Sequence, residues 1–384
     1  MATRIIRFAS PIEPSGASWL LNCFLELGIR IAHKPVVDEV WRGSRVPPGF
    51  MWQDSADGST LKPKAEVLTK WLPALSRQER FNFRTDVEIE YVQDLATASD
   101  DGLEAIFFVR DPRDALYSMF RRVQPELSFE EYLEIPNPQS LLDRVSHWAA
   151  QIRSWQLVDG VRFFRFEDYK SDAGSVLAQV LAALDLAYGA EAIERAVAAS
   201  TSERARAAED EYRRRYPQDR EVANRAGRVG DWRQHAEAAS GVARIERATG
   251  ALMRELGYSF DGGRETPAVA PLQFELLTFL RTVKRPGARA PGARDATPTS
   301  SDPPPPCPAD LLAFAERVDS TLLRRSRLSP DDVRTLLDSL VEVCARYAPQ
   351  TNERLRALRG EFEDGSSYHF ERLRALLAER RRSQ

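Results

Sequence analysis

The chain has few lysines, few cysteines and no long apolar run. Lysine accounts for 6 of its 54 basic residues, and arginine for the other 48. Its three cysteines, Cys23, Cys307 and Cys344, are far apart, which excludes a disulfide framework and the paired spacing of a zinc site. The first residues lack the apolar region of a signal peptide, and no 18-residue stretch is apolar and uncharged. We therefore expect a cytoplasmic protein that holds no metal.

The overall charge is close to balanced. A net charge of −3 and an isoelectric point near 6.0 argue against nucleic acid or a membrane surface as partner. Apolar residues make up 43% of the 384 residues, which is enough for a buried core. The length fits one large domain with a smaller one beside it.

Short apolar segments alternate with helical patterns in the first two thirds of the chain. The segments 4–9, 104–109 and 161–166 have the length and composition of buried strands. Helical patterns lie between and beside them at 17–27, 64–75, 112–121, 139–155 and 174–185. This alternation predicts an α/β domain over residues 1–262 with a central parallel sheet. Sites in such sheets lie at the carboxyl ends of the strands.

The composition changes after this domain. Residues 285–308 contain 8 of the 24 prolines, so we expect a proline- and glycine-rich linker over 263–308. Residues 309–384 are helical in pattern and predict a small module of two to four helices. We expect this module to form a homo-oligomer or to dock a partner.

The loop after the first expected strand has the features of an anion site. It reads S-P-I-E-P-S-G-A-S-W-L from Ser10, with small residues just before a helix start. Backbone N–H groups of such a loop and helix N-terminus form a nest for phosphate. A phosphate loop normally also carries a lysine, but here Glu13 and Pro14 occupy that position.

Two further segments carry anion-binding side chains. Arg110 ends the strand in F-V-R-D-P-R-D-A-L-Y-S, and Ser118 follows two helical turns later. A guanidinium fork and a hydroxyl at this spacing can converge on one anion, although a strand-end arginine paired with a neighbouring Asp is also common. The segment R-A-G-R-V-G-D-W at 225–232 is a basic, glycine-containing loop before a helix start capped by Asp231.

Together and in this order, these segments resemble the sulfotransferases that use 3′-phosphoadenosine-5′-phosphosulfate (PAPS). The family signature P-K-S-G-T-T-W-L is similar to residues 14–20, and R-x-P-x-D-x-x-x-S matches residues 110–118. The closing signature R-K-G-x-x-G-D-W-K-N-H resembles residues 225–235, and F-R-F-E-D-Y at 164–169 resembles the Y-E-D segment. The resemblance spans about residues 4–258 and implies a three-layer, P-loop-like α/β fold.

The resemblance also implies which residues hold the co-substrate. The 5′-phosphosulfate would be held by the amides of Ser15, Gly16, Ala17, Ser18 and Trp19, together with the Ser18 hydroxyl. The 3′-phosphate would be held by Arg110, Ser118, Arg225 and Gly227. Trp19 and Phe166 would stack near the adenine, and core packing is the alternative role for both rings.

The resemblance does not assign the general base or the cation of the loop. Much of the family has a catalytic histidine as general base. The matching segment here is Arg84-Thr85-Asp86, which would place Asp86 at that position. Glu39 or Asp38 is the competing candidate for the base. The family's loop lysine is Pro14 here, and the lysine of its closing signature is Ala226. Either another cation replaces the loop lysine, with Arg7, Lys34 and Arg84 as candidates, or turnover is slow, or catalysis is lost while the nucleotide still binds.

The resulting prediction is sulfuryl transfer from PAPS to a hydroxyl or amine of a small acceptor. The segment 34–64 contains Trp41, Phe50, Met51 and Trp52, which favours a hydrophobic or aromatic acceptor. The alternative is a weakened protein that binds the nucleotide as a scaffold. A P-loop kinase is disfavoured because G-x-x-x-x-G-K-[ST] is absent.

Overall fold

The computed structural model describes most of the chain, in two compact units. The described residues are 3–33, 52–54, 61–63, 66–78, 81–93, 95–96, 100, 102–123, 125–137, 142–217, 227–260, 309–326, 328, 330–360 and 362. The first unit consists of 1–123 and 151–242, and the second of 124–150 and 243–384. The predicted linker, 263–308, lies outside the described residues, so the domain boundaries expected from composition stay predictions.

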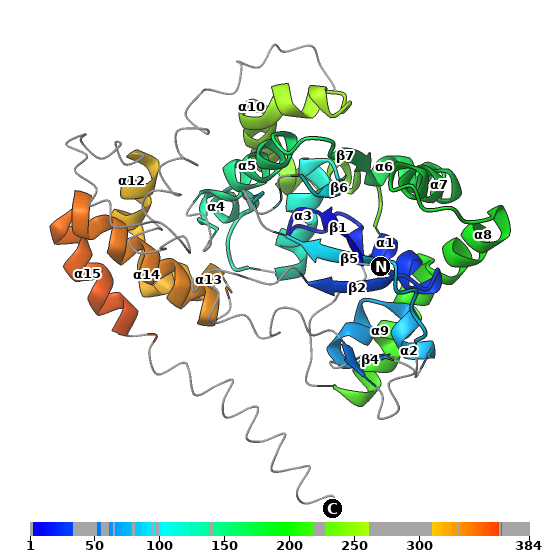
Figure 1. The fold of residues 1–384 in the computed structure, drawn as a ribbon. Helices are drawn as coiled ribbons and strands as arrows, with labels where there is room; N and C mark the ends of the chain where they lie inside the picture. Colours follow the sequence, from blue (N-terminus) through cyan, green and yellow to red (C-terminus); the bar gives the residue numbers. More distant parts are fainter. Residues whose placement is uncertain are drawn as a thin grey trace, which may run out of the picture. The chain divides into compact units, whose positions relative to one another are not determined.

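A five-stranded parallel sheet forms the centre of the first unit (Figure 1). The strand order is β2-β5-β1-β6-β7. The strands are β1 (Arg4–Ala9), β2 (Arg30–His33), β5 (Val87–Val92), β6 (Glu104–Val109) and β7 (Arg162–Arg165). The three strands expected from the sequence are confirmed, and β2 and β5 are additional.

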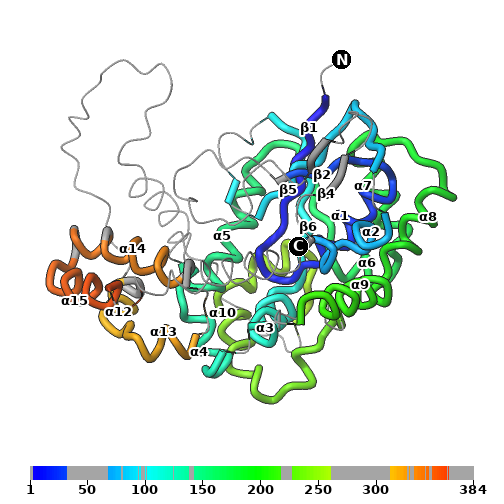
Figure 2. Tube along the Cα trace, turned by 90° about the horizontal axis from the view of Figure 1, so that it is seen from below, coloured from blue at the N-terminus to red at the C-terminus, as the bar shows by residue number. Residues whose placement is uncertain are grey.

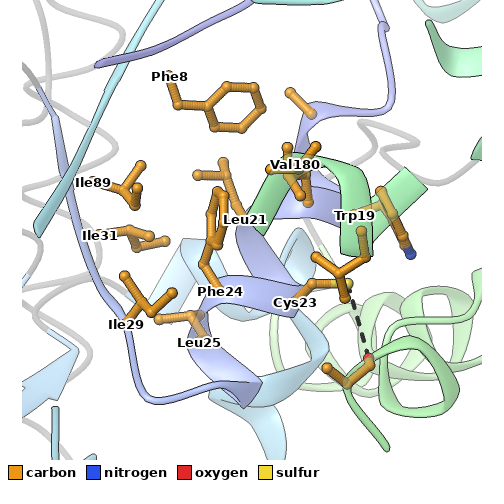
Figure 3. Close-up of a cluster of buried hydrophobic side chains, with 14 of the residues drawn as sticks. Phe8, Trp19, Leu21, Cys23, Phe24, Leu25, Ile29, Ile31, Ile89 and Val180 are labelled. Carbon is orange, nitrogen blue, oxygen red and sulfur yellow. Dashed lines mark hydrogen bonds between the residues drawn. The ribbon is translucent and has the colours of Figure 1, made fainter. Parts of the chain in front are cut away.

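Helices cover both faces of this sheet. One face packs its apolar side chains against α1 (Ala17–Glu26), α7 (Ala173–Ala183) and α8 (Ala190–Ala199). Figure 3 shows this core, where Phe8 and Ile89 from the strands face Phe24 of α1. On the other face, Phe107 contacts Trp155 from the end of α5 (Arg144–Gln156). The three-layer α/β fold expected from the sequence is therefore present.

The strand ends place the predicted loops on one edge. Ala9 of β1 is in register with Phe107 of β6, and Val109 of β6 with Arg165 of β7. Because these strands are parallel, the segments that follow them leave the sheet on the same side. The first unit's remaining elements are β3 (Trp52–Asp54), β4 (Leu61–Pro63), η2 (Glu66–Lys70), α2 (Pro73–Arg77), α3 (Pro112–Val123), α6 (Phe166–Ser171), α9 (Ser202–Arg215), η4 (Asp231–Gln234) and η5 (Ala236–Ala238).

The second unit is helical in its described part. It contains α4 (Phe129–Glu134), most of α10 (Ala239–Glu255), α12 (Ala309–Arg317), α13 (Ser320–Ser326), α14 (Pro330–Tyr347) and α15 (Pro349–Gly360). Figure 2 shows α12, α14 and α15 close together. The helices predicted from residue 309 onward are confirmed for residues 309–360, and the rest of the predicted module, up to residue 384, lies almost entirely outside the described residues. The module also contacts α4, because Glu134 pairs with Arg317 at 3.5 Å and with Arg244 of α10 at 3.0 Å.

Candidate active site

The start of α1 presents backbone N–H groups without a side-chain cap, although the Trp19 amide donates to the Gly16 carbonyl oxygen at 3.0 Å. Gly16 precedes the helix with φ of 85°, a left-handed conformation that favours glycine, and no side chain caps the helix N-terminus. The first N–H groups of a helix have no partner within it and carry the positive end of its dipole. Ser15 is buried, whereas Ser18 in the first turn is half-buried. This geometry is suited to an anion.

Arg110 joins this loop to the 227–232 loop. It leaves the end of β6 and is 4% exposed. Its Nη1 donates to the Pro14 carbonyl oxygen at 3.2 Å, and its Nη2 donates to the Arg228 carbonyl oxygen at 2.8 Å. Its Nε is buried and has no hydrogen-bond partner among the described residues. Burial lowers the pKa of the guanidinium, although carboxylates nearby oppose that shift. A buried, incompletely bonded guanidinium is a strong binding group for a phosphate.

Phe166 lies at the centre of these segments. The guanidinium carbon of Arg110 is 4.5 Å from its ring centroid. A Cβ placed on Gly16 would lie 2.5 Å from Cδ2 of this ring, and one placed on Gly227 would lie 3.7 Å from its Cζ. The two glycine loops therefore meet on one aromatic ring, although Gly16 and Gly227 are more than two hundred residues apart. The predicted stacking of Phe166 on adenine stays a prediction; in the structure the ring is a buried support.

Carboxylates brace the turn around Arg110. The Asp111 amide donates to Glu167 Oε1 at 3.0 Å, which ties the end of β6 to the start of α6. Asp111 in turn pairs with the buried Arg113 at 2.6 Å. Burial raises the pKa of Glu167, the largest influence on that group. These contacts hold the turn after Arg110 against the start of α6.

Trp19 and Ser118 belong to the helices that flank the site. Trp19 in α1 is buried in the core and stacks on Tyr169, with ring centroids 4.0 Å apart and planes inclined by 24°. Ser118 is half-buried in α3, the helix that begins just after Arg110. Adenine stacking by Trp19 and phosphate binding by Ser118 both stay predictions.

Several predicted residues are not described by the structure. Arg225 and Ala226, in the closing signature, lie outside the described residues, as do Lys34, Asp38 and Glu39. The side chains of the expected aromatic acceptor wall over 34–64 lie outside them as well. Glu39 therefore stays an untested candidate for the general base.

The structure does not bring Asp86 to the Arg110 edge of the sheet. Asp86 directly precedes β5, and its carbonyl oxygen accepts from the Arg4 amide at the start of β1 at 2.9 Å. It therefore lies where the parallel strands begin, while the loop after β1 lies where they end. Its exposed carboxylate pairs with Arg84 at 2.5 Å, and this hydrogen bond holds its pKa below the usual range.

We expect Asp86→Asn to leave the rate of sulfuryl transfer within about twofold of the wild type. A general base in the site contributes about 100-fold or more, so a base would be recognised easily. Steady-state kinetics with saturating co-substrate measure this effect. A 100-fold loss of kcat in a folded Asp86→Asn protein would place the carboxylate in the site after all.

The described candidates for the missing loop cation are already engaged. Arg7 lies on β1, where its guanidinium pairs with Glu90 and with Asp100, the latter at 2.9 Å. Arg84 is with Asp86 at the far edge of the sheet. By contrast, Arg110 bonds the carbonyl of Pro14, the residue in the lysine position. Of these three arginines, Arg110 is the one that reaches the loop.

Sequence reasoning missed the way in which the 227–232 loop is held. We expected Asp231 to cap the following helix, but the structure gives η4 no side-chain cap from its N-cap residue, Gly230. Instead, Asp114 accepts from the amides of Gly230 and Trp232, at 2.6 and 3.4 Å. The signal was present in the motif, since Asp114 lies one helical turn after Arg110.

The described residues contain neither a metal-binding cluster nor a membrane-spanning helix. Among them, no three histidine, cysteine or acidic side chains gather in a group able to hold a metal. In the same part of the chain, no helix has the length and apolarity needed to cross a bilayer.

The comparison with protein families agrees with the motifs. Residues 95–257 match the family model described as a sulfotransferase domain. These residues are therefore similar to a sulfotransferase domain. The matched range contains Arg110, Ser118, Phe166 and Gly227, whereas the loop at Ser10–Gly16 lies before it. None of the curated proteins matches the chain in sequence.

Solved structures show weaker likeness. Mouse sulfotransferase SULT7A1, complexed with PAP, is 16% identical with a TM-score of 0.41, over 66% of this chain and 88% of that one. Retinol dehydratase with retinol and PAP is 15% identical with a TM-score of 0.42, over 68% and 84%. The same enzyme with androsterone and PAP is 14% identical with a TM-score of 0.40, over 68% and 84%.

Proposed function

We propose that the sulfotransferase domain transfers a sulfuryl group from PAPS to a hydroxyl or amine of a small, hydrophobic or aromatic acceptor. The observation that carries the proposal is the meeting of three distant segments at Arg110 and Phe166. The loop after β1 supplies backbone donors, the end of β6 supplies a buried guanidinium, and Gly227 begins the loop on the far side of the ring. Two anion-binding elements at one edge suit a nucleotide with a 5′- and a 3′-anion.

The division of labour follows from the chemistry of each group. Amides of Ser15 to Ser18 would hold the 5′-phosphosulfate at the positive end of α1. Arg110 would hold the 3′-phosphate with N–H groups that the two loop carbonyls leave unused, and the Ser118 hydroxyl would add a neutral donor. The nucleotide would then be fixed at both ends, which aligns the sulfur with an incoming acceptor.

The transfer itself requires little covalent help from the protein. An acceptor oxygen or nitrogen forms a bond to sulfur while the bond from sulfur to the bridging oxygen breaks. The acceptor's proton passes to a base, and adenosine 3′,5′-bisphosphate leaves. Backbone donors that face the charge developing on the leaving group stabilise the transition state. Glu39 and Asp38 are the remaining sequence-based candidates for the base.

A transfer assay tests this proposal directly. The full chain is incubated with PAPS labelled at sulfur and with phenols, aliphatic alcohols and aromatic amines. We expect label to appear in at least one class of acceptor, with release of adenosine 3′,5′-bisphosphate in equal amount. Failure of the bisphosphate to bind the protein would contradict the proposal.

The proline at position 14 supports a second candidate function, that of a nucleotide-binding scaffold. Pro14 replaces the lysine that would stabilise the bridging oxygen, and loss of one such donor costs about 2.7–4 kcal/mol of transition-state stabilisation. A protein that binds the bisphosphate but transfers no label to any acceptor would be a nucleotide-binding scaffold. Binding and transfer must therefore be measured separately.

A further inference from the structure

The loop 227–232 contains two glycines, which give its backbone more conformational freedom than other residues would. Side chains outside the loop must therefore hold it in place. Gly227 and Gly230 both have positive φ, 55° and 74°, in a segment of only six residues. Glycines at such angles lose much conformational entropy when the loop becomes ordered. A loop of this kind holds a ligand well only when other groups fix it in advance.

Two side chains of opposite charge, four residues apart, provide these anchors. Arg110 donates to the Arg228 carbonyl oxygen at 2.8 Å. Asp114, in the first turn of α3, accepts from the Gly230 amide at 2.6 Å and from the Trp232 amide at 3.4 Å. The two side chains are 4.0 Å apart and almost fully buried, so little water competes for these bonds. The loop is thus held at a carbonyl by the arginine and at two amides by the acid.

The charge of Asp114 suits this task better than a neutral side chain would. A carboxylate has two acceptor oxygens and no donor, so both loop amides find an acceptor without conflict. Burial disfavours the charged form of Asp114 and so raises its pKa. The neighbouring Arg110 and the Gly230 amide oppose that shift. An asparagine has one acceptor oxygen and would turn its NH₂ group towards a donor.

The pairing with Asp114 also determines where the Arg110 side chain lies. Arg110 is the residue expected to meet the 3′-phosphate, and Gly227 lies on the same loop that Asp114 holds. A loop displaced by the loss of Asp114 would move both the Arg228 carbonyl and the Gly227 amide. The 5′-anion site at Ser15–Trp19 depends on β1 and α1 and has no contact of this kind with Asp114.

We propose that Asp114 is a positioning residue that makes nucleotide affinity depend on the 3′-phosphate. It does so by fixing the 227–232 loop against Arg110, without touching the nucleotide. This inference rests on the proposed function, because it takes the nucleotide to be bound at this edge.

The test compares two nucleotides that differ only in the 3′-phosphate. Dissociation constants for adenosine 3′,5′-bisphosphate and adenosine 5′-monophosphate are measured by calorimetry with the full chain, up to millimolar concentration. We expect Asp114→Asn to weaken the bisphosphate by about tenfold and to leave the monophosphate within about twofold, as for the loss of a charge-assisted hydrogen bond. The matched control is Asp172→Asn, because Asp172 caps α7 by accepting from the Ser175 amide at 2.9 Å. It should leave both constants unchanged.

The outcomes separate the inference from the proposed function. If the wild type binds neither nucleotide, or does not prefer the bisphosphate, the proposed function fails and the inference fails with it. If the wild type prefers the bisphosphate and Asp114→Asn keeps the full preference, only the positioning role is overturned. Equal weakening of both nucleotides by Asp114→Asn would indicate a general structural role and would also overturn it.

Discussion

Arg110→Ala is expected to weaken the binding of adenosine 3′,5′-bisphosphate by at least about 30-fold. Truncating one partner of a buried, hydrogen-bonded charge pair costs about 2–5 kcal/mol, and each 1.4 kcal/mol is a factor of ten in affinity. The substitution removes the expected phosphate ligand. It also removes the two hydrogen bonds that join the Pro14 and Arg228 carbonyls. Calorimetric titration of the full chain measures the effect.

Two further variants isolate the role of the Arg110 fork. Arg110→Lys keeps the charge but cannot bond both carbonyls and a phosphate in one plane, so we expect an intermediate loss of affinity. Arg165→Ala is the matched control, because Arg165 ends the neighbouring strand β7 and pairs with Asp168 at 3.0 Å on a partly exposed surface. It should change affinity by less than about twofold. Equal effects of Arg110→Ala and Arg165→Ala would show that Arg110 has no special part in binding.

Gly16→Ala is expected to destabilise the protein and to abolish nucleotide binding. An L-residue at φ of 85° costs about 1–2 kcal/mol. The new Cβ would also lie 2.5 Å from Cδ2 of Phe166. The Arg110 guanidinium, whose carbon is 4.5 Å from the ring centroid, limits how far this ring can move away. Overpacking of this kind adds about 1–3 kcal/mol, measured as a loss in the free energy of unfolding by urea.

A second glycine separates backbone strain from the clash with Phe166. Gly160 has φ of 80°, and a Cβ added there would meet no atom within 4 Å. Gly160→Ala should therefore show the strain alone and leave binding intact. In a Phe166→Leu background, Gly16→Ala should cost less than it does in the wild type, because the ring is gone. Equal costs for Gly16→Ala and Gly160→Ala would contradict the packing described around Phe166.

The strands that were predicted correctly are those whose burial makes them short apolar runs in the sequence. β1 and β6 are short apolar runs followed by turn residues, and both lie where the sequence placed them. β5 was missed, although the alternation of acids and apolar residues in V-E-I-E-Y-V is itself typical of a half-buried strand. In the structure Glu90 of β5 is buried and pairs with Arg7 of β1. A pairing between distant residues of two strands leaves no local mark in either one.

The candidate site was predictable in its parts and less so in its connections. The motifs identified the loop after β1, Arg110 and the loop at Gly227 because each has its own local signature. Asp86 was chosen by its place along the chain, yet strand direction puts it at the far edge of the sheet. Asp114 was overlooked as an anchor because its partners, the amides of Gly230 and Trp232, carry no side-chain signal.

The most direct measurement of the central claim is a calorimetric titration of the full chain with adenosine 3′,5′-bisphosphate, beside identical titrations with adenosine 5′-monophosphate and ATP. We predict saturable one-to-one binding of the bisphosphate, weaker binding of the monophosphate and none of ATP. We also predict loss of bisphosphate binding in Arg110→Ala but not in Arg165→Ala. Absence of bisphosphate binding at millimolar concentration, or binding that Arg110→Ala leaves unchanged, would contradict the account.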